Sequence, residues 1–136
     1  MRIIGGNLRG STLHLPENQD TRPLKDISRE SIFNLLIHSN KFSFEIKNSI
    51  ILDLYAGTGS FGLECLSRQS KKVYFIEKSK NAVKTLEKNI EKLKLKNKTK
   101  IFNDDIFKII NKKNIFSSKF NLIFCDPPFK NENIED

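Results

Sequence analysis

The chain of 136 residues has two cysteines, and none of its apolar runs approaches the ~20 residues that a membrane-spanning helix needs. Cys65 and Cys125 stand far apart without a second pair, which excludes a disulfide framework and a cysteine metal site. Both lie in apolar surroundings, so we expect two buried thiols. The first residues, Met1-Arg-Ile-Ile-Gly-Gly6, lack the apolar segment of a secretion signal. These absences favour a cytoplasmic protein with no membrane association and no metal.

Acidic residues are also scarce relative to basic ones, with 16 Asp and Glu against 24 Lys and Arg and a net charge of +8. A basic balance favours a polyanionic partner such as nucleic acid. Lysine, isoleucine and asparagine are all abundant, however, and an A/T-rich coding sequence would produce this charge without selection for binding. The positions of the arginines are therefore more informative than the net charge.

Strand and helix patterns alternate from residue 50 onward. Short apolar runs predict strands over residues 50–54, 73–76, 99–102 and 120–125, and the segments between them predict helices over 60–68, 79–95 and 106–111. In the longest of these helices, lysines at every fourth position form a stripe that we expect to face solvent. The alternation predicts one α/β domain with a mostly parallel, doubly wound sheet.

The first 40 residues differ from this pattern. Glycines at positions 5, 6 and 10 permit tight turns, so residues 1–25 should form a small hairpin or arm. Pro23 can open a helix over about 24–38. We expect Arg29 and Glu30 mainly on its outer side, and its apolar face is expected to contain Ile27, Ile32, Phe33, Leu36 and Ile37.

A glycine-rich turn follows the first strand of the α/β part. Gly57-Thr-Gly-Ser-Phe-Gly62 matches G-x-G-x-x-G, which lets a backbone approach a ligand closely but does not choose the ligand. Glu77 closes the next strand, where a carboxylate can bind ribose hydroxyls of NAD or of S-adenosylmethionine. Asp53 would repel a pyrophosphate but suits an ammonium group, and Asp105 can accept from an adenine amine. These residues favour S-adenosylmethionine, although either aspartate could instead cap a helix or turn.

The last predicted strand ends in Asp126-Pro-Pro-Phe129. Proline fixes φ and removes a donor, so this stiff turn presents acceptors in set directions. We expect the Asp126 carboxylate and the Pro127 carbonyl to accept the two N–H bonds of a nucleobase amine, with Pro128 stiffening the turn. Phe129 would stack on the base. Core packing for Phe129 and a turn-forming role for Asp126 are the structural alternatives.

These blocks resemble the bacterial 16S rRNA guanine-N2 methyltransferases of the RsmD type. Arg2-Ile-Ile-Gly-Gly6 and Arg9-Gly10 are similar to that family's opening, and Thr21-Arg-Pro23 with Arg29-Glu-Ser31 to its second block. The resemblance implies a Rossmann-like fold, S-adenosylmethionine as cofactor, and a guanine of the small-subunit rRNA as substrate. Arg2, Arg9, Arg22 and Arg29 would hold RNA phosphates, although Arg22 or Arg29 could instead pair with Glu30 or Asp26. The expected cofactor contacts are Asp53, Tyr55, Ala56, Gly57, Gly59, Ser60, Glu77, Lys78, Asp105 and Ile106.

We accordingly expect a monomer with an RNA-facing segment at 1–40 and the first part of the methyltransferase domain at 41–136. The family continues beyond its catalytic motif with a fifth strand and an antiparallel pair, so the C-terminal strands are expected to be missing and the fourth strand to form a sheet edge. Two alternatives stay open. One is an adenine-N6 methyltransferase acting on DNA or RNA, and the other is an inactive binding remnant.

Overall fold

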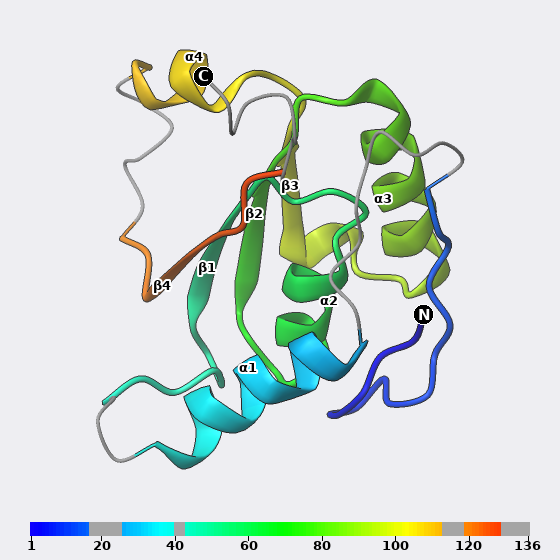
Figure 1. The fold of residues 1–136 in the computed structure, drawn as a ribbon, viewed down its shortest axis with the longest axis vertical. Coiled ribbons are helices and arrows are strands. Elements are labelled where there is room, and N and C mark those ends of the chain that lie inside the picture. Colours follow the sequence, from blue (N-terminus) through cyan, green and yellow to red (C-terminus); the bar gives the residue numbers. More distant parts are fainter. Residues whose placement is uncertain (17–25, 40–42, 113–118, 129–136) are drawn as a thin grey trace, which may run out of the picture.

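The computed structural model describes residues 1–16, 26–39, 43–112 and 119–128, so Arg22 and Phe129 lie outside the described residues. Four parallel strands form one sheet in the order β3-β2-β1-β4 (Figure 1). The strands are β1 (Ile50–Leu54), β2 (Lys72–Ile76), β3 (Thr99–Phe102) and β4 (Leu122–Cys125). The predicted α/β, doubly wound, Rossmann-like architecture is confirmed, and β4 is an edge of the described sheet, as expected.

One helix precedes the first strand, and the others lie between successive strands. They are α1 (Asp26–His38), α2 (Ser60–Ser67), α3 (Lys80–Lys92) and α4 (Ile106–Ile110), with a short 3-10 turn, η1 (Lys96–Lys98), before β3. The lysine stripe of α3 is exposed, as predicted, because the opposite side of this helix is apolar and buried. No helix within the described ranges is long and apolar enough to cross a membrane.

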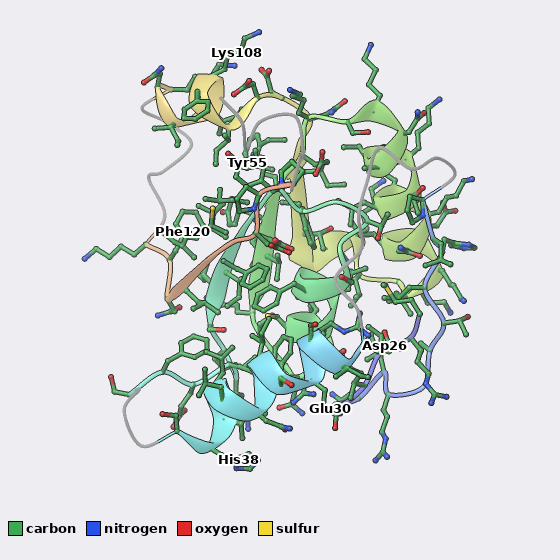
Figure 2. All side chains as sticks on the ribbon, in the orientation of Figure 1. Asp26, Glu30, His38, Tyr55, Lys108 and Phe120 are labelled. Atoms are coloured by element: carbon green, nitrogen blue, oxygen red, sulfur yellow. The ribbon has the colours of Figure 1, made fainter. Side chains whose placement is uncertain are left out.

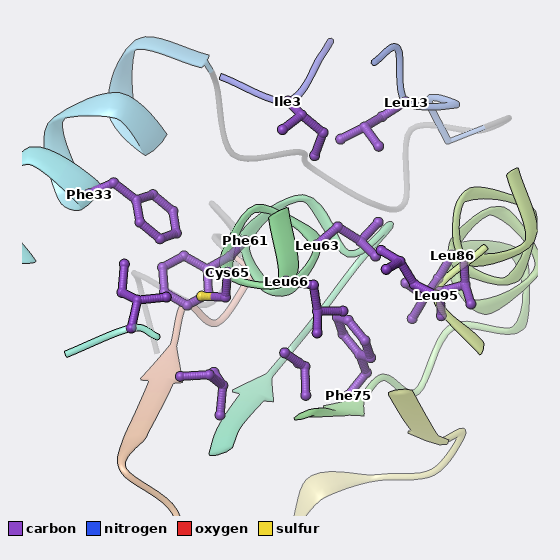
Figure 3. Close-up of a cluster of buried hydrophobic side chains, with 14 residues drawn as sticks. Ile3, Leu13, Phe33, Phe61, Leu63, Cys65, Leu66, Phe75, Leu86 and Leu95 are labelled. Atoms are coloured by element: carbon purple, nitrogen blue, oxygen red, sulfur yellow. The ribbon is translucent and has the colours of Figure 1, made fainter. Parts of the chain in front are cut away.

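The larger core cluster lies between one face of the sheet and the helices α1, α2 and α3. Phe33 of α1 stacks on Phe61 of α2, and Phe61 stacks in turn on Phe124 of β4, with ring centroids 5.0 and 3.8 Å apart. Figure 3 shows Ile3 and Leu13, from the start of the chain, on the side of α2 that faces away from Phe75. Helix α2 is therefore enclosed on all sides, and each of its residues is buried.

The smaller core cluster lies on the other face of the sheet, where Ile106 and Ile109 of α4 pack against Leu52 and Ile76. This face is less covered near the edge strand, since Ile123 is 57% exposed. Cys65 is buried as expected, but the prediction of a buried thiol at Cys125 is wrong. The reason is position: Cys125 is the last residue of an edge strand.

Residues 1–16, called the N-terminal arm below, form the expected small hairpin. Arg2 bridges Thr12 in antiparallel fashion, and the amides of Ile3 and Leu13 bond to the carbonyls of Ser11 and Met1. The arm is fixed to the sheet domain by side chains of α2. The carboxylate of Glu64 accepts the amides of Ile4 and Gly5 at 2.9 and 2.8 Å. The hydroxyl of Ser67 accepts the amide of Leu8 at 2.9 Å and donates to the carbonyl of Gly5 at 2.6 Å.

Helix α1 differs from its predicted face. Its inner stripe is formed by Arg29, Ile32, Phe33 and Leu36, which lie at helical spacing. Ile27 is 81% exposed and Ile37 is 49% exposed, so their predicted burial is wrong. The stripe is shifted because α2 presents the buried carboxylate of Glu64 to α1, and Arg29 pairs with it. Glu30 does point outward from α1 (Figure 2).

Candidate active site

Three carboxylates lie at or next to the carboxyl ends of three neighbouring strands, on one side of the sheet. Asp53 lies within β1 beside Phe124 of β4, Glu77 directly follows β2, and Asp126 directly follows β4. The strand order reverses between β1 and β4, and in open α/β sheets ligands bind at the carboxyl ends of the strands where the order reverses. Figure 2 shows Tyr55, the residue after β1, near this edge. The sequence-predicted acidic residues of these three strands therefore meet at the expected binding edge.

Asp53 is the most perturbed group of this edge. It is 1% exposed, and its Oδ2 accepts the amide of Gly62 at 3.2 Å, in the first turn of α2. Burial raises the pKa of Asp53 to about 8, with smaller upward contributions from the charges of Glu77 and Asp126, while the Gly62 amide opposes the shift. Both of these charges are negative, so a cation placed here would relieve an electrostatic cost.

The glycine turn between β1 and α2 is held at several backbone atoms. Glu77 Oε1 accepts the amide of Gly57 at 2.7 Å, and Glu77 Oε2 accepts the amide of Ser79 at 2.9 Å. The carbonyl of Thr58 accepts Asn89 Nδ2 of α3 at 3.1 Å. A carboxylate offers about four lone-pair sites, so Glu77 keeps acceptor capacity for ribose hydroxyls. The turn is thus preformed, which lowers the entropy that a ligand must remove.

The glycines of this turn also serve packing. Gly59 has φ +89, and a Cβ there would lie 2.2 Å from Leu86 Cδ1 of α3. At Gly62, inside α2, a Cβ would lie 2.4 Å from the ring of Phe75 on β2. The third glycine of the motif therefore brings α2 close to the sheet, which is its established role in nucleotide-binding turns.

The remaining predicted cofactor residues lie around this edge. Asp105 caps α4, since its Oδ1 accepts the amide of Phe107 at 2.8 Å, and this confirms the capping alternative while leaving its second oxygen for a ligand. Ile106 packs in the smaller core. Lys78 is exposed. The others lie along the turn: Tyr55 and Ala56 are half-buried, and Ser60 is buried as the first residue of α2.

The predicted catalytic motif is described up to Pro128. Asp126, Pro127 and Pro128 are exposed beyond the end of β4, next to the buried Asp53. Their acceptors therefore face solvent at the edge where a base would have to enter. Phe129 lies outside the described residues, so its stacking on the base stays a prediction.

The arginines expected at RNA fall into two groups. Arg2 and Arg9 are exposed on the N-terminal arm, as phosphate contacts require. Arg29 is wholly buried and pairs with Asp26 at 2.9 Å and with Glu64, and it also donates to the carbonyl of Arg2. The prediction that Arg29 contacts RNA is therefore corrected to the internal pairing that was its alternative. Arg22 lies outside the described residues.

Two asparagines of the site escaped the sequence analysis. Asn89 is wholly buried although asparagine is polar, and the signal was its place on the apolar stripe of α3, three residues after Leu86. Asn103 donates from Nδ2 to the carbonyls of Glu77 and Lys78 at 2.9 and 3.2 Å, which fixes the backbone after β2. No sequence pattern marked Asn103.

Comparisons with known proteins show which family this chain belongs to. The family model described as "Conserved hypothetical protein 95" matches residues 1–136. The Ribosomal RNA small subunit methyltransferase D of Escherichia coli strain K12 is 34% identical over all of this chain, and that of Haemophilus influenzae is 36% identical over 95% of it. A solved structure described as a candidate methyltransferase, yhhF from Escherichia coli, superposes with a TM-score of 0.79 and 32% identity over 95% of this chain. The chain spans 64% of the length of each of these three proteins.

Proposed function

Because this chain belongs to the RsmD-type family, whose model matches all of its residues, we propose that it methylates the N2 amine of a guanine in 16S rRNA, with S-adenosylmethionine as methyl donor. The relatives named as small-subunit rRNA methyltransferases support the rRNA and the chemistry. The choice of guanine as the target base is inferred from the resemblance of the N-terminal sequence blocks to the RsmD-type family. The structural observation that supports this proposal most strongly is that Asp53, Glu77 and Asp126 lie near one another at the carboxyl ends of the strands, where the strand order reverses.

The residues at this edge fit S-adenosylmethionine, which supplies an activated methyl group on a sulfonium and carries an ammonium group. Asp53 is buried close enough to Glu77 and Asp126 for their negative charges to raise its pKa, and a cationic ligand at this point would stabilise the charged form of all three carboxylates. Glu77 would hold the ribose hydroxyls and Asp105 the adenine amine. The same carboxylates would oppose the pyrophosphate of NAD, so the dinucleotide reading of the glycine turn is the weaker one.

The acceptors after β4 would position the target base. A guanine amine is a weak nucleophile, since its lone pair is delocalised into the ring. Asp126 and the Pro127 carbonyl would accept its two N–H bonds and turn the nitrogen lone pair toward the methyl group. Positioning of this kind can supply roughly 7–11 kcal/mol of the barrier. As the new nitrogen–carbon bond forms, the methyl–sulfur bond breaks and S-adenosylhomocysteine leaves. The amine proton passes to water during or after transfer, when the nitrogen carries positive charge.

The N-terminal arm would hold the RNA. Exposed Arg2 and Arg9 would contact phosphates by charge-assisted hydrogen bonds, which position the RNA without reading its sequence. A guanine in a loop is the more favourable target, because a paired base must first be extruded from its helix at a cost in free energy. The monomeric state and the cytoplasmic compartment stay predictions from the sequence.

Calorimetric titration with S-adenosylmethionine, followed by a transfer assay on undermethylated 30S particles, tests this function. Saturable binding and incorporation of methyl groups into 16S rRNA support it. Binding without turnover would instead support the binding-remnant alternative. N6-methyladenine as product would support the adenine alternative, since Asp126–Phe129 could grip either amine.

A further inference from the structure

The side chain of Asn89 on α3 joins the glycine turn to the N-terminal arm. It is wholly buried. Its Oδ1 accepts the amide of His14 at 2.6 Å, and its Nδ2 donates to the carbonyls of His14 and Thr58 at 3.3 and 3.1 Å. One amide group thus binds both backbone groups of an arm residue and the central carbonyl of the turn. Nearly all of its hydrogen-bonding capacity is used.

Each end of this link is fixed to functional groups. On one side, Thr58 lies between Gly57, whose amide is held by Glu77, and Gly59, whose amide bonds to the carbonyl of Ala56. On the other side, His14 follows the buried Leu13, and its strand of the hairpin pairs with the strand that carries Arg2. A displacement of the turn must therefore either break the Asn89 bonds or move the arm.

We propose that Asn89 is a positioning residue that couples occupancy of the cofactor turn to docking of the N-terminal arm. This inference rests on the proposed function, since it assigns the turn to the cofactor and the arm to RNA. A ligand that orders the turn holds the Thr58 carbonyl in place, and this strengthens the Asn89 bonds to His14. Coupling is reciprocal, so a docked arm also favours the cofactor.

Substitutions at residue 14 separate this coupling from simple packing. The side chain of His14 is exposed, so His14→Ala keeps both backbone bonds to Asn89. His14→Pro removes the amide that Asn89 Oδ1 accepts without touching the turn. At residue 89, Asn89→Asp keeps an acceptor for the His14 amide but loses the donors to Thr58 and to the His14 carbonyl.

The first experiment is amide hydrogen exchange of the free protein. We expect His14→Pro to speed exchange at Gly57 and Gly59 about tenfold, within the usual range of coupling between sites, and His14→Ala to leave it unchanged. Amides of β1 and β2 report on global unfolding. If these amides also lose protection in the His14→Pro protein, that substitution has destabilised the whole fold, and the same comparison is made with Asn89→Asp. Faster exchange confined to the arm would overturn the coupling.

The second experiment adds S-adenosylhomocysteine. We expect it to slow exchange at the arm amides of Leu13 and His14 about tenfold in the unsubstituted protein and in His14→Ala, but not in Asn89→Asp. Protection of the turn without protection of the arm would overturn the coupling while leaving the cofactor assignment intact. Absence of S-adenosylhomocysteine binding would instead contradict the proposed function, and the free-protein comparison would still decide the coupling.

Discussion

The guanidinium Nε of Arg29 lies 3.5 Å from Oε1 of Glu64, and neither side chain is exposed. Glu64 Oε2 also pairs with Arg68 Nε at 2.9 Å. Desolvation lowers the pKa of Arg29, although the charges of Glu64 and Asp26 oppose this shift. The pair joins α1 to α2 at the point where Glu64 also holds the arm backbone. An arginine that the sequence assigned to RNA is therefore part of the internal framework.

Replacing Arg29 by alanine should destabilise the fold. Breaking a buried ion pair by removing one partner costs about 3–5 kcal/mol, and we expect the lower end because Glu64 keeps Arg68 and two amides. Urea unfolding followed by circular dichroism measures the change. Glu30→Ala on the exposed side of α1 is the matched control and should shift stability by no more than about 0.5 kcal/mol. Equal effects of the two substitutions would contradict the buried-pair account.

Arg9→Ala should act on RNA binding and not on stability. Arg9 is exposed, so its loss should weaken binding to 16S rRNA fragments and lower the slope of log affinity against log salt by about 0.7–1. Filter binding over a range of salt concentrations measures both quantities. Lys47→Ala, which removes an exposed cation from the segment before β1, is the control and should leave the slope unchanged. The same loss of slope in both variants would remove Arg9 from the RNA interface.

Stability should fall with rising pH because of Asp53. Its pKa is raised from 3.8 in the ordinary state to about 8 in the fold, so between these values the folded chain holds a proton that the unfolded chain has lost. The stabilisation is complete below about pH 4 and is lost as pH rises toward 8, by at most about 1.4 kcal/mol per pH unit. Asp53→Asn should remove this dependence. Urea unfolding of both proteins at pH 5, 6.5 and 8 tests it, and parallel profiles would refute the raised pKa.

Gly62→Ala should destabilise the protein by overpacking α2 against the sheet. The added Cβ would meet the ring of Phe75 at 2.4 Å, and extra methyl groups in a packed core cost about 1–3 kcal/mol. Phe75→Leu removes the ring atoms concerned. The double variant should therefore lose less stability than the sum of the single variants, as a double-mutant cycle by urea unfolding would show. Strict additivity would mean that the glycine serves another purpose.

The sequence predicted the strands well because each of them, central or at an edge of the parallel sheet, is a short apolar run. The bounds of β1 and β3 were right to the residue, and β4 begins two residues later than expected, at Leu122. The proposed binding residues Asp53, Glu77 and Asp126 were each picked out beside a predicted strand, and the structure brings them near one another because the carboxyl ends of parallel strands lie on one side of the sheet.

What the sequence did not reveal is the pairing of polar side chains inside the fold. Arg29 and Asn89 each occupy a position on an apolar helix stripe, but their partners come from distant segments, Glu64 on α2 and His14 on the arm. Periodicity reports which face is buried and not which buried polar groups meet. The exposure of Cys125 was missed for another reason: its burial was inferred from its apolar neighbours in sequence, although the strand that it ends was itself expected at a sheet edge.

The central claim is tested most directly by the product that forms on undermethylated 30S particles in the presence of S-adenosylmethionine. Nucleoside mass analysis of the digested 16S rRNA identifies the methylated base. We predict N2-methylguanosine with the unsubstituted protein and none with Asp126→Ala, whose affinity for S-adenosylmethionine should stay unchanged because Asp126 is proposed to contact the base. Any other methylated nucleoside, or equal product from Asp126→Ala, would contradict the account.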